Sequence, residues 1–389
     1  MNIRKTATVV AILLAGTAVS HAQLGGNAQQ QAAQAAAEAG YTQLQIDDQY
    51  LHLSIPGHTM GETMGVATNS KGHLFVYSRT GKGGIARGGT AAMLFEFDQN
   101  NKFVKEIDPD SYGASFAHAV RVDKDDNIWS VDEGSGMVVK HTPQGMHEFW
   151  LGRVPEAIDY LEANLEPLKY NRLKPMMPGK PVGRMGEFDR ETDIAWDSKG
   201  NSYISDGYGN SRFVKISPDG HWLKAVGTFG SGKDQFNTPH TIAADAEDNI
   251  YVGDRGNGRI QVFDNHGKFI RILNQAADVT LPNDIHAIRQ PPAPSATPPA
   301  NKTISPGAPW AICISPPNKA GEQFLFSSDS YPGRIYKMKL DGTVVGTIGA
   351  AGKELGHFGD IHELACPTDN LLYAGEELNW RVSKIVIHP

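Results

Sequence analysis

Short apolar segments alternate with polar turns along most of this chain. From about residue 60, an apolar strand leads to a turn and then to a strand that ends in a small residue and an acid. A short loop, an arginine and a third strand follow, and a second turn opens a fourth strand. The pattern is clearest over residues 118–150, 193–227 and 241–273. Turns such as Asp-Gly, Lys-Gly and Asp-Asn favour positive φ, so the pattern predicts repeated β-hairpins.

The spacing of the repeats predicts how many hairpins the fold contains. A glycine recurs in the second turn of four copies, at Gly145, Gly220, Gly267 and Gly342, with separations of 75, 47 and 75 residues. A period near 47 fits a four-stranded blade, and each longer interval then contains an insertion of about 28 residues. Looser copies begin at Met64, Trp310 and His362. We therefore predict an all-β fold, a six-bladed β-propeller of NHL-type repeats with four-stranded antiparallel blades.

The propeller is expected to occupy residues 43–389. Residues 1–22 have the charged start, apolar stretch and small-residue ending of a signal peptide, and residues 23–42 form a flexible Gln/Ala-rich leader. A strand around residues 43–53 would complete the last blade and cover its exposed edge. The insertions at 153–190 and 274–309 either cover a binding face or decorate the surface. The sequence leaves that choice open.

Composition and charge narrow the classes of function. Cleavage after Ala22 would leave 389 − 22 = 367 residues with a net charge of 34 − 43 = −9. An acidic chain without Lys/Arg runs is poorly suited to nucleic acid or anionic membranes. No later segment is long and apolar enough to span a membrane. We expect an exported protein, periplasmic or secreted.

The chain has two cysteines, Cys313 and Cys366. A disulfide between them is compatible with an oxidising compartment. Aligned by strand, however, the two residues fall one position apart, which would direct their side chains to opposite faces of a blade. The sequence therefore favours two separate buried thiols.

Paired charges recur from blade to blade and are interpreted as structural. An acid precedes an arginine by five or six residues, so each pair spans a hairpin and suits a cross-strand ion pair. The pairs are Asp206 with Arg212, Asp254 with Arg259, Asp329 with Arg334, and Glu376 with Arg381.

Three histidines stand apart from this structural pattern. His118, His240 and His362 open blades 2, 4 and 6, and both separations are 122 residues. Each precedes an innermost strand, and alternate blades of a six-bladed ring lie about 120° apart. The three imidazoles should therefore converge on the central axis, where they would make an open Zn²⁺ site. The alternative is three unrelated histidines that cap strand ends.

Three further side chains are expected on the same side of the ring. The loop after the second strand of a blade carries Arg79 in blade 1, Tyr208 in blade 3 and Arg255 in blade 4. A guanidinium there could bind a substrate carboxylate, and a phenol close to Zn²⁺ could act as a general base. The alternatives are solvated arginines and a tyrosine that only packs.

At these residues the chain resembles the peptidyl-α-hydroxyglycine α-amidating lyases, over roughly Met64 to the end. The resemblance is carried by DGYGNSR and by PHTIAADAEDNIYVGDRGNGRIQ. It implies zinc held by His118, His240 and His362, Tyr208 as the base, and Arg79 and Arg255 as the arginines of the site. It also implies a structural calcium ion bound by the carbonyls of Val66 and Val120 and the carboxylate of Glu363, which stands where the family has Asp.

The resemblance further implies cleavage of the N–C bond of a carbinolamide to an amide and glyoxylate, from a small or peptide substrate with a terminal carboxylate. Departures from the family affect the substrate pocket, where Met64 is expected and where Asp360 replaces a methionine. Gly209 replaces a cysteine, so a family disulfide is absent. The competing hypotheses are a non-enzymatic NHL propeller that binds a ligand or protein, and another propeller enzyme such as a lactonase.

Overall fold

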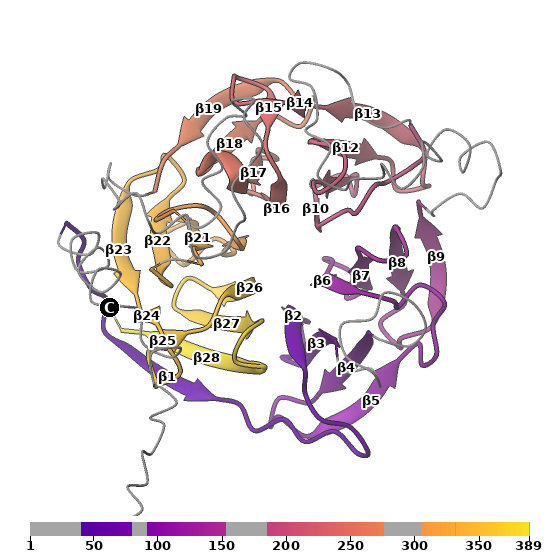
Figure 1. Cartoon of the computed structure of the whole chain (residues 1–389), viewed down its shortest axis with the longest axis vertical. Helices are drawn as coiled ribbons and strands as arrows, with labels where there is room; N and C mark the ends of the chain where they lie inside the picture. The colour runs from indigo at the N-terminus through magenta and orange to yellow at the C-terminus, as the bar shows by residue number, and fades with distance from the viewer. Residues whose placement is uncertain (1–39, 80–91, 153–184, 276–304, 331, 389) are drawn as a thin grey trace, which may run out of the picture.

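The computed structural model describes residues 40–79, 92–152, 185–275, 305–330 and 332–388. Six four-stranded antiparallel sheets are arranged around a central axis (Figure 1). The predicted six-bladed all-β propeller is confirmed. The signal peptide, most of the leader and most of both insertions lie outside the described residues.

The blades follow the chain order. The first three are β2 (Glu62–Thr68), β3 (Leu74–Arg79), β4 (Met93–Phe97) and β5 (Phe103–Ile107); β6 (Ala117–Val122), β7 (Ile128–Asp132), β8 (Met137–His141) and β9 (His147–Leu151); and β10 (Asp193–Trp196), β11 (Ser202–Asp206), β12 (Arg212–Ile216) and β13 (Trp222–Val226). The next two are β16 (Pro239–Ala244), β17 (Ile250–Asp254), β18 (Arg259–Phe263) and β19 (Phe269–Leu273); and β20 (Ile312–Ile314), β21 (Phe324–Ser328), β22 (Ile335–Lys339) and β23 (Val344–Ile348).

The sixth blade closes the ring with the first strand of the chain. It contains β26 (Ile361–Thr368), β27 (Leu371–Glu376), β28 (Arg381–Ile387) and β1 (Ile46–Tyr50). β1 pairs antiparallel with β28, from Ile46 opposite Ile387 to Tyr50 opposite Ser383. This is the strand expected around residues 43–53, and it covers the edge that β28 would otherwise expose.

Apolar side chains fill the spaces between neighbouring blades. One cluster joins Val131 and Val138 of blade 2 to Ile194, Ile204 and Val214 of blade 3, all of them buried. Because each blade buries its faces against its neighbours, the ring holds the innermost strands β2, β6, β10, β16, β20 and β26 around a central tunnel (Figure 1). In the described residues, no helix is long and apolar enough to cross a membrane.

Three of the four expected acid–arginine pairs are direct ion pairs. The arginine Nε lies 2.9 Å from Asp206 in blade 3, 2.8 Å from Asp254 in blade 4 and 2.7 Å from Glu376 in blade 6. Blade 5 differs, because the hydroxyl of Tyr336 accepts from Arg334 at 2.6 Å and donates to Asp329 at 2.6 Å. In blade 5 the same acid–arginine spacing therefore links the two strands of the hairpin through the hydroxyl of Tyr336.

The prediction of two separate thiols is wrong, because Cys313 and Cys366 form a disulfide with a Cα–Cα distance of 6.1 Å. The two strands belong to different blades, so they share no common pleat. The ladder of β26 also shifts register between Ala365 and Thr368, next to Cys366. Alternation counted along an aligned strand therefore could not give the direction of this side chain.

Reduction of this disulfide is expected to destabilise the propeller. The bond closes a loop with a sequence separation of 53 residues, for which loop-closure entropy gives at most about 4 kcal/mol. Denaturant unfolding of native protein and of the Cys313→Ser/Cys366→Ser double variant would measure the difference. A full complement of two reactive thiols in unreduced, denatured protein would contradict the pairing.

Candidate functional site

A β-bulge in each of three blades directs a histidine into the tunnel. The ladder skips one residue of the innermost strand at these places: His118 between Ala117 and Ala119, His240 between Pro239 and Thr241, and His362 between Ile361 and Glu363. A bulged residue is unpaired and its side chain is re-aimed. Blade 1 has the same shift at Met64, between Thr63 and Gly65. The repeat therefore places a bulge at this position, and the residue at the bulge determines which side chain enters the tunnel.

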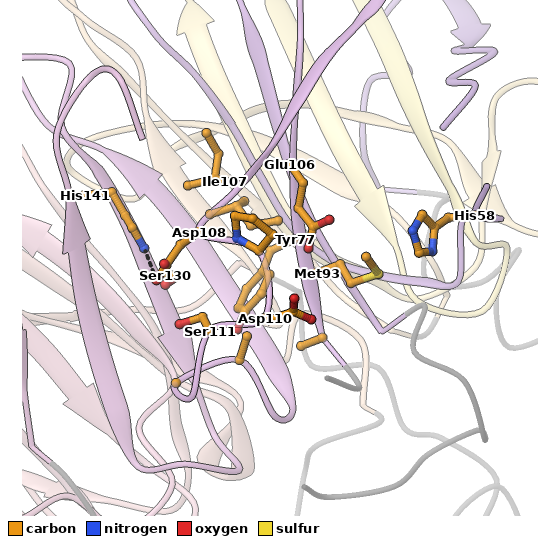
Figure 2. A pocket seen from close by; sticks show the side chains of 15 residues that line it. His58, Tyr77, Met93, Glu106, Ile107, Asp108, Asp110, Ser111, Ser130 and His141 are labelled. Atoms are coloured by element: carbon orange, nitrogen blue, oxygen red, sulfur yellow. Dashed lines mark hydrogen bonds and ion pairs between the residues drawn. The ribbon is translucent and has the colours of Figure 1, made fainter. Parts of the chain in front are cut away.

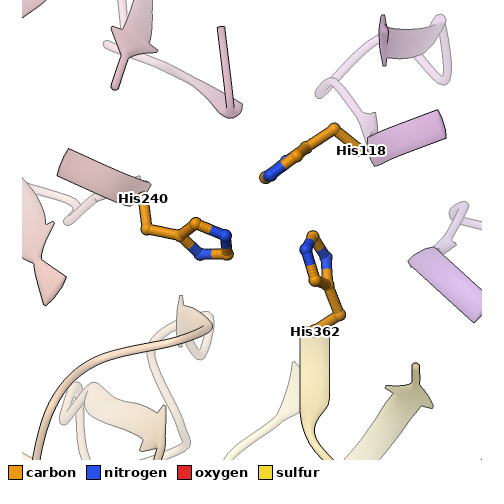
Figure 3. Close-up of side chains that lie close together, drawn as sticks. All are labelled: His118, His240 and His362. Atoms are coloured by element: carbon orange, nitrogen blue, oxygen red, sulfur yellow. The ribbon is translucent and has the colours of Figure 1, made fainter. Parts of the chain in front are cut away.

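The three imidazoles meet as the spacing of 122 residues predicts. Their ring centroids lie 4.5, 4.8 and 5.0 Å apart, and one ligand atom from each ring lies within 4.8 Å of the others. Figure 3 shows the rings entering a common space from three directions. Two zinc–nitrogen bonds of about 2.0–2.1 Å in a tetrahedron separate their nitrogens by about 3.3 Å. A small inward movement of each ring would give that spacing.

The outer nitrogen of each ring contacts a backbone carbonyl of the next blade. Nδ1 of His118 lies 2.6 Å from the carbonyl oxygen of Thr192, Nδ1 of His240 2.6 Å from that of Trp310, and Nδ1 of His362 2.9 Å from that of Met64. A carbonyl only accepts hydrogen bonds, so each Nδ1 carries the proton and each Nε2 keeps a lone pair. This is the orientation that metal-binding histidines commonly have, and the donor set fits Zn²⁺.

Burial keeps these imidazoles neutral. Desolvation lowers the pKa of His118 and of His240 well below the ordinary value, and it lowers the pKa of His362 to about 3. The positive charges of Arg79 and Arg255 act in the same direction. Neutral imidazoles are the form that binds a metal ion.

Acid is therefore expected to destabilise the metal-free protein through the triad. A histidine whose folded pKa is depressed contributes its full stability above about pH 6.5, and this contribution is lost as pH falls toward the folded pKa. For His362 the loss would extend down to about pH 3, at up to about 1.4 kcal/mol per pH unit. Urea unfolding between pH 4 and 7.5 would measure it.

Buried carboxyls change the stability in the opposite direction as pH falls, because burial raises their pKa; that of Asp254 rises to about 6. The triad's part is therefore isolated by comparing the wild type with His362→Gln. The variant should lose less stability between pH 6.5 and 4 than the wild type does. An equal loss of unfolding free energy in both proteins would contradict a contribution from His362.

Tyr208 and Arg255 lie beside the three histidines, as expected. The hydroxyl of Tyr208 lies 3.0 Å from Nε2 of His240 and 3.4 Å from Nε2 of His118. Nη1 of Arg255 donates to the same hydroxyl at 3.4 Å. Burial raises the pKa of Tyr208, and the charge of Arg255 opposes that rise. The phenol thus reaches the Nε2 atoms of two of the three histidines.

Arg255 has spare capacity for a ligand. Its guanidinium stacks on Trp310 at 4.4 Å from the ring centroid. Its buried Nε has no hydrogen-bond partner among the described residues, and no acid there lies within ion-pair distance. A buried guanidinium in that state is suited to bind a carboxylate.

Arg79 lies on the same side but is already engaged. Nη1 donates to Glu62 at 3.1 Å, and Nε donates to the carbonyl of Ala117 at 3.0 Å. Its guanidinium stacks on Phe116 at 3.5 Å, with Glu133 at 3.9 Å. The two arginines are therefore not equivalent in this structure.

Sequence reasoning missed several charged groups of the site. Nη2 of Arg190 donates to the carbonyl of Tyr208 at 2.8 Å, and its guanidinium lies 5.3 Å from the phenol ring. Glu133 directly follows Asp132 at the end of β7, and Glu377 directly follows Glu376 at the end of β27, as Arg255 follows Asp254. This shared position could have identified both glutamates as site residues. Arg190 lies in an insertion, where the repeat gives no corresponding position.

Two further acids, Asp360 and Glu377, contact each other through their backbones, and the charges of Arg79 and Arg255 act on Glu377. Asp360 is buried and accepts from Oγ of Ser330 at 2.5 Å, and its carbonyl accepts from the backbone N–H of Glu377 at 2.9 Å. Burial and the charge of Asp360 raise the pKa of Glu377 to about 7. Asp360, at the position where the resemblance implies a methionine, thus places a buried acid two residues before His362.

The residues expected to bind calcium do not fit that ion. Oε2 of Glu363 accepts the backbone N–H groups of Val66 and Val120, both at 3.0 Å. Its Oε1 lies 2.7 Å from Nε of Arg121. Oε1 accepts no hydrogen bond among the described residues, because the Nε–H of Arg121 donates to Asp193. A divalent cation at this carboxylate would therefore meet the positive charge of the guanidinium.

A separate pocket of about 270 Å³ lies between blades 1 and 2 (Figure 2). Its lining includes Tyr77, Glu106, Asp108 and His141, and Nε2 of His141 lies 3.3 Å from Asp108. None of the three converging histidines lines it. The chemistry of the site therefore belongs to the tunnel and not to this pocket.

Comparisons with known proteins agree with the predicted repeat. The NHL repeat model matches residues 236–263. NHL repeat-containing protein 3 of Mus musculus is 40% identical over 25% of this chain and 30% of its own length. A Caenorhabditis elegans protein named as a probable peptidyl-α-hydroxyglycine α-amidating lyase is 25% identical over 56% of this chain and 59% of its own length. The chain thus spans less than two thirds of the length of either relative.

Among solved structures, virginiamycin B lyase from Staphylococcus aureus, an inactive variant with quinupristin, is similar over 88% of this chain and 100% of its own. The TM-score is 0.51 and the identity is 10%, so this likeness concerns the fold alone. By its repeats and its fold, the chain is therefore similar to NHL-repeat β-propellers, and over part of its length it is similar to proteins named as peptidyl-α-hydroxyglycine α-amidating lyases.

Proposed function

We propose that this protein is a zinc-dependent carbon–nitrogen lyase. Its substrate would be an α-hydroxyglycine-type carbinolamide, small or peptidic, with a terminal carboxylate, and its products an amide and glyoxylate. The observation that carries the proposal is the set of three neutral imidazoles whose Nδ1 atoms contact carbonyls and whose Nε2 atoms face one point. The amidating lyase named among the relatives supports the reaction class.

Zinc would be held by Nε2 of His118, His240 and His362, where it would act as a Lewis acid that makes the substrate hydroxyl more acidic. Arg255 would bind the substrate carboxylate, since its buried Nε has no partner among the described residues. Arg79 would contribute positive charge from its place beside Glu62 and Glu133. Stacking on Trp310 and Phe116 would hold the two guanidinium planes.

Tyr208 would accept the proton of the substrate hydroxyl. The C–O oxygen then forms the carbonyl of glyoxylate, the C–N bond breaks, and the nitrogen takes up a proton to give the amide. Burial alone disfavours the phenolate, so this role depends on positive charge near the hydroxyl, which Arg255 supplies at 3.4 Å. Arg190, which donates to the backbone of Tyr208, would hold its loop in place.

The substrate pocket would include Met64 and Asp360. Met64 is buried and its carbonyl orients His362, so a change there would act on the triad as well as on the substrate. Asp360 and Glu377 would favour a polar or cationic group beside the scissile amide. We further propose that the protein is exported to the periplasm or secreted, which the Cys313–Cys366 disulfide supports.

The test is glyoxylate release from an N-acyl-α-hydroxyglycine such as α-hydroxyhippurate. Zinc-loaded protein should release glyoxylate and the amide in equal amounts, and chelator-treated protein should recover this activity when zinc is restored. Zinc-loaded protein that releases no glyoxylate from such substrates would refute the proposal and favour a propeller that only binds a ligand or partner.

A further inference from the structure

A buried charge cluster lies in the tunnel next to the three histidines. Arg121, in β6, extends its guanidinium toward blades 3, 5 and 6. Its Nε and Nη2 donate to the two carboxylate oxygens of Asp193 at 2.9 and 2.8 Å. Its Nη1 and Nη2 also donate to the carbonyls of Leu364 at 2.8 Å and Ile312 at 3.2 Å. Oε1 of Glu363 lies 2.7 Å from the same Nε as an ion pair without a hydrogen bond, since that N–H donates to Asp193.

The cluster is connected to every strand that carries one of the histidines. Glu363 directly follows His362, and its Oε2 accepts the N–H of Val120 in the strand of His118. Asp193 accepts from Oγ1 of Thr241 at 2.8 Å, and Thr241 directly follows His240. The same carboxylate accepts the N–H of Ile242 at 3.1 Å. One guanidinium and two carboxylates therefore link β6, β16 and β26.

We propose that the guanidinium of Arg121 is the resident cation of the tunnel, in the place where the family resemblance implies a calcium ion, and that it positions the three histidine-bearing strands. A guanidinium presents a planar fork that matches the Asp193 carboxylate and the tunnel carbonyls. It remains charged at any physiological pH and cannot be removed by a chelator. The inference does not depend on the lyase reaction.

Calcium binding by the whole, unmodified protein is the first test. Protein dialysed into calcium-free buffer is analysed for calcium separately from zinc and is then titrated calorimetrically with CaCl₂. The expected result is far less than one calcium per chain, no binding heat, and a Tm that does not change with millimolar calcium. One tightly held calcium per chain, or a Tm raised by calcium, would overturn the proposal.

The second test exchanges one cation for the other. Arg121→Ser should lower the Tm and should make it respond to calcium, because Asp193, Glu363 and the tunnel carbonyls are then left without a cation. The Tm of Arg121→Lys and its response to calcium should lie between those of the wild type and Arg121→Ser, since lysine keeps the positive charge but lacks the planar guanidinium. Lys124→Ser is the control, because Lys124 lies in the next turn and its side chain is 67% exposed.

The positioning role has its own readout in the visible spectrum of Co²⁺-loaded protein. Arg121→Ser should change the ligand-field bands, and calcium should restore them in part, whereas Lys124→Ser should leave them unchanged. An Arg121→Ser protein with wild-type bands and wild-type Tm would refute the positioning role. If that variant does not fold, the calcium measurements on the wild type still decide the first half of the proposal.

Discussion

His240→Ala is expected to abolish tight zinc binding and, with it, glyoxylate release. The imidazole is buried, its Nδ1 contacts the carbonyl of Trp310 at 2.6 Å, and its Nε2 faces the other two rings. Loss of a direct ligand should cost more than the roughly 10–100-fold in affinity that loss of an outer partner costs. Activity should fall to the level of the chelator-treated wild type. Metal analysis after dialysis and the glyoxylate assay measure the two effects.

The matched control is His221→Ala. His221 lies in the turn before β13 and its side chain is 79% exposed, so its removal should leave zinc content and activity unchanged. His118→Ala and His362→Ala should behave like His240→Ala, because the three residues occupy equivalent bulges. Full zinc content in any of the three alanine variants would contradict the shared site.

Tyr208→Phe is expected to lower kcat by about 10²–10⁴-fold, the usual contribution of a positioned general base. The substitution removes a hydroxyl that lies 3.0 Å from His240 and 3.4 Å from Arg255 and keeps the ring that packs against both. Zinc content should therefore remain near that of the wild type. Steady-state kinetics with α-hydroxyhippurate, together with metal analysis, would measure both.

Tyr112→Phe serves as the control, because the side chain of Tyr112 is exposed at the surface. Two outcomes would count against Tyr208 as the base. Activity within a few-fold of the wild type would mean that the proton goes elsewhere. A joint loss of zinc and activity would mean that the phenol supports the metal site and does not take part in proton transfer.

The repeat made the fold and the triad predictable from sequence. Hairpin turns at a constant spacing identified six blades, and two equal separations of 122 residues placed His118, His240 and His362 on alternate blades. The contacts of their Nδ1 atoms were not predictable, because the carbonyls of Thr192, Trp310 and Met64 come from the intervening blades. These contacts depend on how neighbouring blades pack, which cannot be read from the sequence of one repeat.

The wrong prediction for the cysteines and the neglect of Arg121 have a related cause. The Cys313–Cys366 disulfide joins two blades, so alternation within one strand gave the wrong answer. The calcium expectation considered Glu363 with Val66 and Val120 and overlooked Arg121, although an arginine within the apolar inner strand HAVRV is a visible signal. A buried charge needs a partner, and its partners Asp193 and Glu363 lie far away in sequence.

X-ray absorption at the zinc edge would measure the ligands of the bound ion itself. We expect one zinc per chain with three imidazole nitrogens at about 2.0–2.1 Å and one oxygen ligand from water or substrate. His240→Ala should lose this signal. Protein that takes up no zinc, or binds it through sulfur or carboxylates alone, would contradict the account.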